Sequence, residues 1–161
     1  MSAAVRDATR ADYDRIRELF VEGDEMNFAA LPDFFRRVDA TRRRRDEFFD
    51  LILADDKFSL LVADEGDSVV GFAQAHIEEA RRVPNLVPRE TLFIDILMVT
   101  EARRGNGVGR ALMERTYAWG RERDARDVEL NVYEFNAQAL AFYERLGYTT
   151  SSRRMWRELP S

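Results

Sequence analysis

Apolar residues recur along this chain at the spacings of both helices and strands. A short strand over residues 3–7 is followed by a Thr-x-x-Asp helix start at Thr9. The apolar residues of the helix that begins there share one face: Tyr13, Ile16, Leu19 and Phe20. The spacing predicts a second helix over residues 42–54, in which three apolar side chains point inward: Phe48, Phe49 and Ile52.

Strand-like runs occupy the middle of the chain. Residues 59–65 and 69–79 are joined by a polar turn at residues 65–68, which predicts an antiparallel hairpin. Residues 92–99 (LFIDILMV) are apolar on both faces and predict a central strand. A helix over residues 108–123 follows, with four residues available for burial: Leu112, Met113, Tyr117 and Ala118. The pattern then predicts a strand over 128–133, a helix over 137–146 and a last strand over 149–159, giving a mixed α/β (α+β) fold.

Length and composition narrow the classes of protein. A chain of 161 residues predicts one domain over residues 1–161 with a single core. Cysteine is absent and His76 is the only histidine, so we expect no disulfides, no cysteine nucleophile and no metal site. No apolar stretch is long enough to span a bilayer and no secretory leader is visible, which predicts a cytoplasmic protein without membrane contact.

The charge balance argues against a nucleic-acid binder. The chain carries 25 basic and 30 acidic residues, a formal net charge of −5 at pH 7. The arginine run at residues 42–45 is one candidate phosphate or RNA patch, but acidic residues follow it at once. A solvated helix face is therefore the preferred interpretation of this run.

A glycine-rich loop joins the central strand to the next helix. Its residues are Arg104, Gly105, Asn106, Gly107, Val108, Gly109 and Arg110. Glycine lets the backbone approach a ligand, and the free amides and dipole of a helix start favour an anion, so the loop predicts a phosphate cradle. It has no Walker Gly-Lys-Ser/Thr, and Arg110 breaks the dinucleotide-binding spacing. The alternative interpretation is a flexible turn.

A second motif lies some twenty residues beyond that helix. It reads Asn136-x-x-Ala139-x-x-Phe142-Tyr143 and is followed by Gly147-Tyr148. This motif comes after a strand ending in Leu97, Met98 and Val99 and after the arginine-glycine loop. In this order and spacing, the chain resembles the GNAT superfamily of N-acetyltransferases over nearly its whole length. The resemblance implies a mixed, mostly antiparallel central sheet of about six or seven strands, flanked by about four helices.

The same resemblance implies a chemistry. Acetyl-CoA is the cosubstrate, no metal is used, and the acetyl group passes directly to a primary amine in a ternary complex. The coenzyme's pyrophosphate binds the loop amides of Arg104–Arg110, and its pantetheine arm pairs with the main chain of Leu97, Met98 and Val99. Asn136 bonds the pantetheine, a role compatible with its alternative as a plain helix N-cap. Tyr143 donates a proton to the thiolate that leaves; its alternative is a core aromatic.

Asp95 is the candidate base. A carboxylate inside an apolar strand is costly to bury, and the position matches one where family members carry a base or water-orienting acid, more often glutamate. A structural aspartate paired with an arginine or a backbone amide is the alternative. His76 is expected to assist proton transfer or to line the acceptor pocket, unless it is a structural histidine.

The resemblance also implies an acceptor site, because residues 26–35 lie where the family builds its acceptor-side loop; packing in the core is the alternative for the apolar residues among them. Apolar wall candidates are Met26, Phe28, Leu31, Phe34 and Phe35, and acidic candidates that attract a cationic acceptor are Asp24, Glu25 and Glu134.

The preferred acceptor is a small-molecule amine. Protein N-termini or lysines, and a non-catalytic coenzyme A binding regulatory module, remain the alternatives. The last predicted strand, with Met155 and Trp156, is expected to pair with another copy if the chain forms a homodimer.

Overall fold

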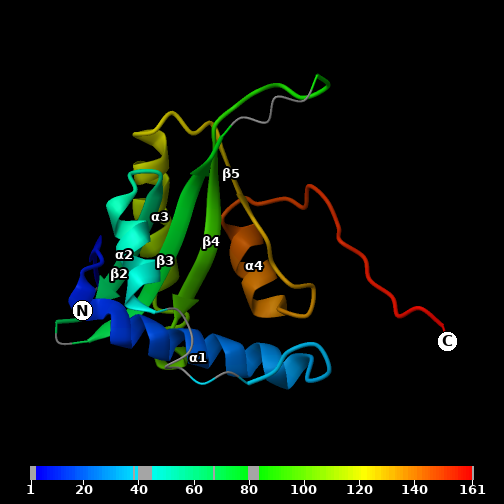
Figure 1. Cartoon of the computed structure of the whole chain (residues 1–161), viewed down its shortest axis with the longest axis horizontal. Helices are drawn as coiled ribbons and strands as arrows, with labels where there is room; N and C mark the ends of the chain where they lie inside the picture. Colours follow the sequence, from blue (N-terminus) through cyan, green and yellow to red (C-terminus); the bar gives the residue numbers. More distant parts are fainter. Residues whose placement is uncertain (1–2, 38, 40–44, 67, 80–83, 161) are drawn as a thin grey trace. The chain divides into compact units, whose positions relative to one another are not determined.

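The computed structural model describes residues 3–37, 39, 45–66, 68–79 and 84–160. Contacts divide the chain into two units, Met1–Asn131 and Val132–Ser161. The first unit contains the sheet and the helices α1, α2 and α3; the second contains α4 (Ala137–Arg145) (Figure 1). The predicted mixed α/β fold is confirmed, with four α-helices among the described residues.

The sheet has five strands, which lie in the order of the chain. They are β1 (Ala4–Asp7), β2 (Phe58–Asp64), β3 (Val69–Glu78), β4 (Thr91–Val99) and β5 (Asp127–Leu130). Neighbours from β1 to β4 pair antiparallel, as the predicted hairpin required, whereas β4 and β5 pair parallel. The sheet is therefore mixed and mostly antiparallel, as predicted, but the expected six or seven strands are wrong for the described residues.

One predicted strand is missing, and another is shorter than predicted. Residues 149–159 form no strand, and Met155 and Trp156 are 87% and 78% exposed. A strand exists only where its backbone pairs with another, and a run of threonine, serine and arginine brings little apolar area to hold such a pairing. The strand predicted over 128–133 ends early, at Leu130, because its pairing with β4 stops there.

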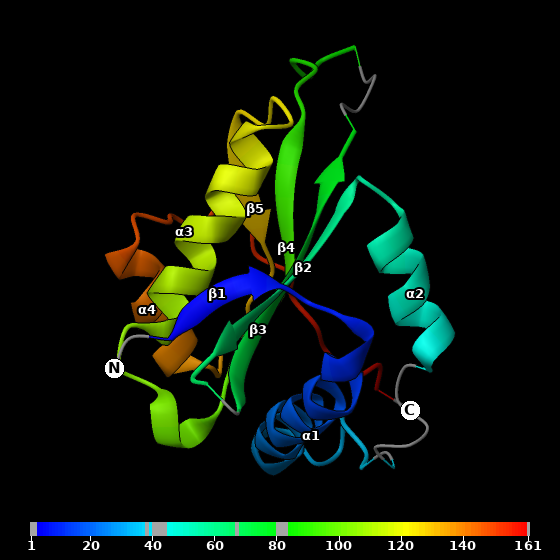
Figure 2. The same cartoon turned by 90° about the vertical axis from the view of Figure 1, so that its left-hand side faces the viewer.

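The helices of the first unit cover both faces of the sheet. Figure 2 shows α1 (Tyr13–Ala30) and α2 (Asp46–Ala54) on one face and α3 (Val108–Arg121) on the other. The core under α1 and α2 includes Ile16, Leu19, Phe49, Val62 and Phe72. The core under α3 includes Leu61, Ala73, Val108 and Leu112. α1 thus buries the apolar face that its spacing predicted, and α3 buries Leu112 and Met113 and half-buries Tyr117 and Ala118.

The second helix differs from its prediction at two points. Residues 42–44, which include most of the arginine run, lie outside the described residues, and α2 begins at Asp46. Phe49 and Ile52 are buried as predicted, but Phe48 is 37% exposed, so its inward placement is wrong. Successive helical residues turn by about 100°, which leaves Phe48 at the edge of the face that Phe49 and Ile52 define.

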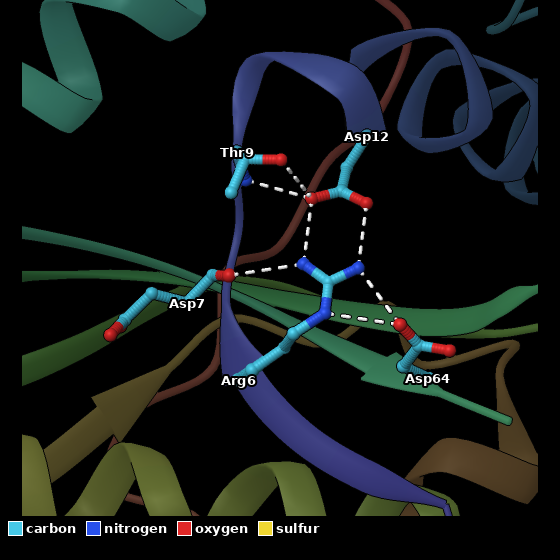
Figure 3. A network of polar contacts seen from close by, with 5 residues as sticks. All are labelled: Arg6, Asp7, Thr9, Asp12 and Asp64. Atoms are coloured by element: carbon cyan, nitrogen blue, oxygen red, sulfur yellow. Dashed lines mark hydrogen bonds and ion pairs between the residues drawn. The ribbon is translucent and has the colours of Figure 1, made fainter. Parts of the chain in front are cut away.

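A polar network joins β1 to the start of α1 (Figure 3). The Arg6 guanidinium donates to both carboxylate oxygens of Asp12, at 2.8 and 2.9 Å, and twice to Asp64 Oδ2, at 3.0 and 2.9 Å. A fifth bond reaches the main-chain oxygen of Asp7 at 3.2 Å. Asp12 also accepts from the main-chain N–H and the hydroxyl of Thr9, which is the predicted Thr-x-x-Asp helix start.

Candidate active site

The pairing of β4 with β3 contains one irregularity in register. The pairing of β3 with β4 places Gln74 opposite Ile96 but Ala75 opposite Ile94, so Asp95 is an extra residue in β4. Such a β-bulge bends a strand and redirects its side chains. Ile96 and Met98 therefore pack on the α1 face, while Leu97 and Val99 pack on the α3 face.

The pairing of β5 with β4 ends beside this bulge. β5 pairs with β4 only from Thr91 to Ile94. Beyond that point, the Asp95–Val99 half of β4 has β3 on one edge and, within the described part of the chain, no strand on the other. Asp95 is exposed as a whole residue although its side chain is only 24% exposed, so its main chain is open. This edge can hydrogen-bond an extended ligand through backbone groups.

The glycine-rich loop follows β4 after one 3-10 turn, η3 (Glu101–Arg103). Gly105 and Gly107 have φ values of 80° and 85°, and a Cβ added at either would meet nothing within 4 Å. Gly107 is the N-cap of α3, and no side chain caps that helix. The first amides of α3, at Val108, Gly109 and Arg110, have no carbonyl within the helix to bind. The loop therefore presents backbone donors and a positive helix end to an anion.

Contacts at the end of β4 hold this loop in place. Arg104 Nε donates to the carbonyl oxygen of Val99 at 3.0 Å, so this side chain ties the loop to the strand. The Thr100 hydroxyl donates to Glu22 of α1 at 3.0 Å. A Cβ at Gly23 would lie 2.1 Å from Met98 Cε, so glycine lets α1 cross close over β4. Sequence reasoning missed Glu22, Gly23 and Thr100; a glycine inside an amphipathic helix was the available signal.

The candidate base has a specific partner. Asp95 Oδ2 lies 2.9 Å from His76 Nδ1, and the two side chains are 24% and 27% exposed. Phe58 of β2 and Phe93 of β4 are both in register with His76, and their ring centroids lie 5.5 and 5.4 Å from the imidazole. The structure thus brings together two residues that were considered separately in the sequence.

The predicted acceptor-side residues lie at the end of α1 and in the turn after it. The Arg37 guanidinium lies 4.1 Å from the Phe28 ring centroid and also donates to Glu25 at 2.8 Å. Leu31 and Phe34 are 39% and 61% exposed, and Phe35 packs edge-on against Phe34. Exposed apolar side chains beside a cation and a carboxylate provide both surface and charge for a ligand.

The second motif forms a local structure in the second unit. Asn136 Oδ1 accepts from the Ala139 N–H at 3.0 Å, so Asn136 is the N-cap of α4. The Tyr143 ring meets Phe142 and Tyr148 edge-on, with centroids 5.3 and 5.4 Å apart. At the helix end, the Tyr148 N–H donates to the Tyr143 carbonyl, with Gly147 at φ 93° between them. This C-terminal cap explains the glycine at that position of the motif.

Three further points concern an ion pair of Glu134, groups that could bind a metal ion and helices that could span a membrane. Glu134 pairs with Arg153 at 3.7 Å, and both side chains are exposed. Within the described ranges, no three acidic, histidine or cysteine side chains gather into a group that could hold a metal ion. None of the helices that the structure describes has the length and apolar character needed to cross a membrane.

Comparisons with known proteins return one family. Residues 13–148 match the Acetyltransferase (GNAT) family. An uncharacterized N-acetyltransferase of Methanocaldococcus jannaschii is 27% identical over 144 residues, which are 89% of this chain but only 59% of that protein. A streptothricin acetyltransferase of Streptomyces lavendulae is 33% identical over 95 residues, 59% of this chain and 46% of that protein. The crystal structure of a mutant BH1408 protein from Bacillus halodurans, 30% identical, superposes with a TM-score of 0.90 over 98% of this chain and 99% of that chain.

Proposed function

Because the chain belongs to the GNAT family of acetyltransferases, we propose that it is an acetyl-CoA-dependent N-acetyltransferase that acts on a small-molecule primary amine. Family members use acetyl-CoA. The observation that carries the proposal is the open edge of β4 from Asp95 to Val99, which is followed, after η3 and the glycine-rich loop, by a helix start that no side chain caps. An extended pantetheine arm suits the edge, and a pyrophosphate suits the helix start.

The residues of the coenzyme site act mainly through their backbone. The loop from Arg104 to Arg110 offers its amides, and Leu97, Met98 and Val99 offer the strand edge. The open space around Gly105 and Gly107 supports this assignment, since a larger residue would occupy the cradle. Asn136 uses its oxygen for Ala139, so its amide nitrogen is the group proposed to donate to the coenzyme.

The proposed chemistry is direct transfer. When bound, the coenzyme supplies an acetyl thioester: a C–N bond forms to the amine, the C–S bond breaks, and sulfur leaves with the electron pair. An alkylammonium acceptor must lose two protons to become the amide. We assign the first to the Asp95–His76 pair, which passes it to solvent. We assign to Tyr143 the delivery of one proton to sulfur, and the second proton of the amine returns through solvent to the tyrosinate and restores the phenol. No covalent enzyme intermediate is required.

The acceptor is the least constrained part of the proposal. The aromatic and acidic residues at the end of α1 suit a cationic amine with an apolar portion. The name of the Streptomyces lavendulae relative gives streptothricin, not a protein, as its substrate, which supports a small-molecule acceptor.

The first test is thiol release from acetyl-CoA with polyamines, amino sugars, amino acids and short peptides, with coenzyme binding measured in parallel. Release that depends on a small amine supports the proposal, and release with peptides alone would move the acceptor class to proteins. Coenzyme binding without turnover on any acceptor would favour the regulatory module. Absence of binding would overturn the assignment of the loop.

The cradle has a matched pair of variants. Gly107→Asp places a carboxylate at the start of α3, and we expect coenzyme affinity to fall at least about tenfold because like charges repel there. Gly66→Asp is the control, because Gly66 has a similar φ of 79° in open space, in the turn between β2 and β3. Equal losses of affinity in both variants would contradict the cradle.

The proton donor is tested at Tyr143. Tyr143→Phe keeps the ring contacts and should lower turnover more than coenzyme affinity. Tyr148→Phe, on the neighbouring ring, removes a hydroxyl without removing the proposed acid. Unchanged turnover in Tyr143→Phe would end that assignment.

A further inference from the structure

The contact between His76 and Asp95 determines which nitrogen of the imidazole carries hydrogen. An ionised carboxylate only accepts hydrogen bonds, so the Nδ1 atom that lies 2.9 Å from Asp95 Oδ2 must be the donor. A neutral imidazole carries one hydrogen, and its other nitrogen is then an acceptor. Nε2 is therefore the basic atom of this ring.

The surroundings of the ring keep it in this orientation. His76 stands in a cross-strand row between Phe58 and Phe93, whose ring centroids lie 5.5 and 5.4 Å from the imidazole, within the range of packed aromatic pairs. Asp95 lies two residues after Phe93 in β4, and alternate residues of a strand share a face, so its side chain reaches the face of the sheet that carries His76. The imidazole is nonetheless 27% exposed, so it is accessible to a ligand.

We propose that His76 Nε2 is the atom that removes the proton from the acceptor ammonium, and that Asp95 is a positioning residue that acts through His76. This assignment rests on the proposed function and refines it. The ammonium nitrogen gives one proton to Nε2, the ring becomes an imidazolium held by the Asp95 carboxylate, and the proton then leaves to solvent. No electrons are exchanged with the protein.

The chemistry of the two groups favours this division of roles. A free carboxylate is a weak base at neutral pH, whereas an imidazole ordinarily titrates close to it. Asp95 is also already occupied by the Nδ1 contact. In this arrangement the carboxylate accepts the Nδ1–H hydrogen bond and so fixes the tautomer, and the more basic imidazole moves the proton.

The first experiment reads the tautomer without using activity. His76 is the only histidine in the chain, so the ¹⁵N signals of its ring need no assignment by mutation. The proposal expects a neutral ring with hydrogen on Nδ1, and a shift towards Nε2–H in Asp95→Asn. A wild-type ring with hydrogen on Nε2 would overturn the positioning role of Asp95, whether or not the protein is a transferase.

The second experiment separates the base from its support. His76→Phe keeps an aromatic ring between Phe58 and Phe93, and turnover should fall about a hundredfold while coenzyme affinity stays within about threefold. Asp95→Asn should lose about tenfold in turnover with the same unchanged affinity. Glu79→Gln, which removes a carboxylate near the end of β3, is the control and should retain wild-type turnover.

Rescue provides the readout that a packing role would not give. Added imidazole should restore part of the turnover of His76→Ala, because it supplies the missing basic nitrogen. Full turnover in His76→Phe, or no rescue of a folded His76→Ala, would overturn the role of Nε2. If the wild-type protein transfers no acetyl group at all, the proposed function fails, and the tautomer still decides whether Asp95 positions His76.

Discussion

Two acid–base clusters of the first unit, around Arg6 and around His76, differ in how many of their nitrogen atoms have hydrogen-bond partners. Around Arg6, all five guanidinium N–H donors have acceptors, and the side chain of Asp12 is only 8% exposed. Around His76, one hydrogen bond fixes the imidazole and the other ring nitrogen has no protein partner among the described residues. Both clusters pair a carboxylate with a nitrogen base.

The difference separates structural from chemical use of the same groups. The Arg6 network ties β1 and β2 to the start of α1, so its contacts contribute to stability. The His76 pair leaves one ring nitrogen available for a ligand, and in the proposed mechanism its contact serves the chemistry of transfer. Substitutions in the first cluster should therefore change the free energy of unfolding, and substitutions in the second should change turnover.

The largest effect is expected from the double variant His76→Phe/Asp95→Asn. Because Asp95 acts through His76, turnover should fall about a hundredfold, no further than in His76→Phe alone. The measurement is thiol release at saturating acetyl-CoA, with urea unfolding to confirm that stability changes by less than about 1 kcal/mol. Losses that multiply would mean that the two residues act independently.

The next largest effect concerns stability. Asp12→Asn removes the charged acceptor of Arg6, and we expect the free energy of unfolding at pH 7 to fall by about 2–3 kcal/mol. Turnover per folded molecule should not change. Asp7→Asn is the matched control, because Arg6 bonds only the main-chain oxygen of Asp7 (Figure 3). An equal loss in the control would attribute the effect to net charge.

The fold was predictable because most of its elements are encoded locally. The apolar spacing of α1 and α3 and the apolar runs of β2, β3 and β4 each suffice to identify an element. The two motifs around Gly107 and Tyr143 then supported a family resemblance, which the match over residues 13–148 confirms. The last strand failed because strand formation depends on a partner elsewhere in the molecule.

The site was predictable only in part. Asp95 was noticeable as a polar residue in an apolar strand, and the glycine loop was visible in the sequence. The partner of Asp95 was not visible in the sequence, since the pairing of Asp95 with His76 depends on the register of β3 and β4 and on one extra residue in β4. Nothing local to either strand encodes that bulge. The catalytic and binding roles remain predictions for the experiments above.

Acid provides a smaller test of the Arg6 network. The hydrogen bonds from Arg6 lower the pKa of Asp12 from 3.8 to about 2. The unfolded chain therefore binds a proton at a higher pH than the folded one, and stability falls as pH drops from about 4 to about 2. The loss should reach about 2 kcal/mol. Urea midpoints across this range should fall less in Asp12→Asn, and parallel curves would contradict the assignment.

The smallest effect is expected at an exposed carboxylate. Asp14 is 90% exposed and accepts from Arg17, which also donates to Asp46 at 2.8 Å. Asp14→Asn should lower the free energy of unfolding by less than about 0.5 kcal/mol, because water replaces the lost contact and Arg17 keeps its second partner. The measurement is the urea midpoint beside that of Asp12→Asn. A loss as large as in Asp12→Asn would mean that burial and the number of hydrogen bonds do not decide how much an ion pair stabilises this protein. The contrast between the Arg6 network and the His76 pair would then have no physical basis.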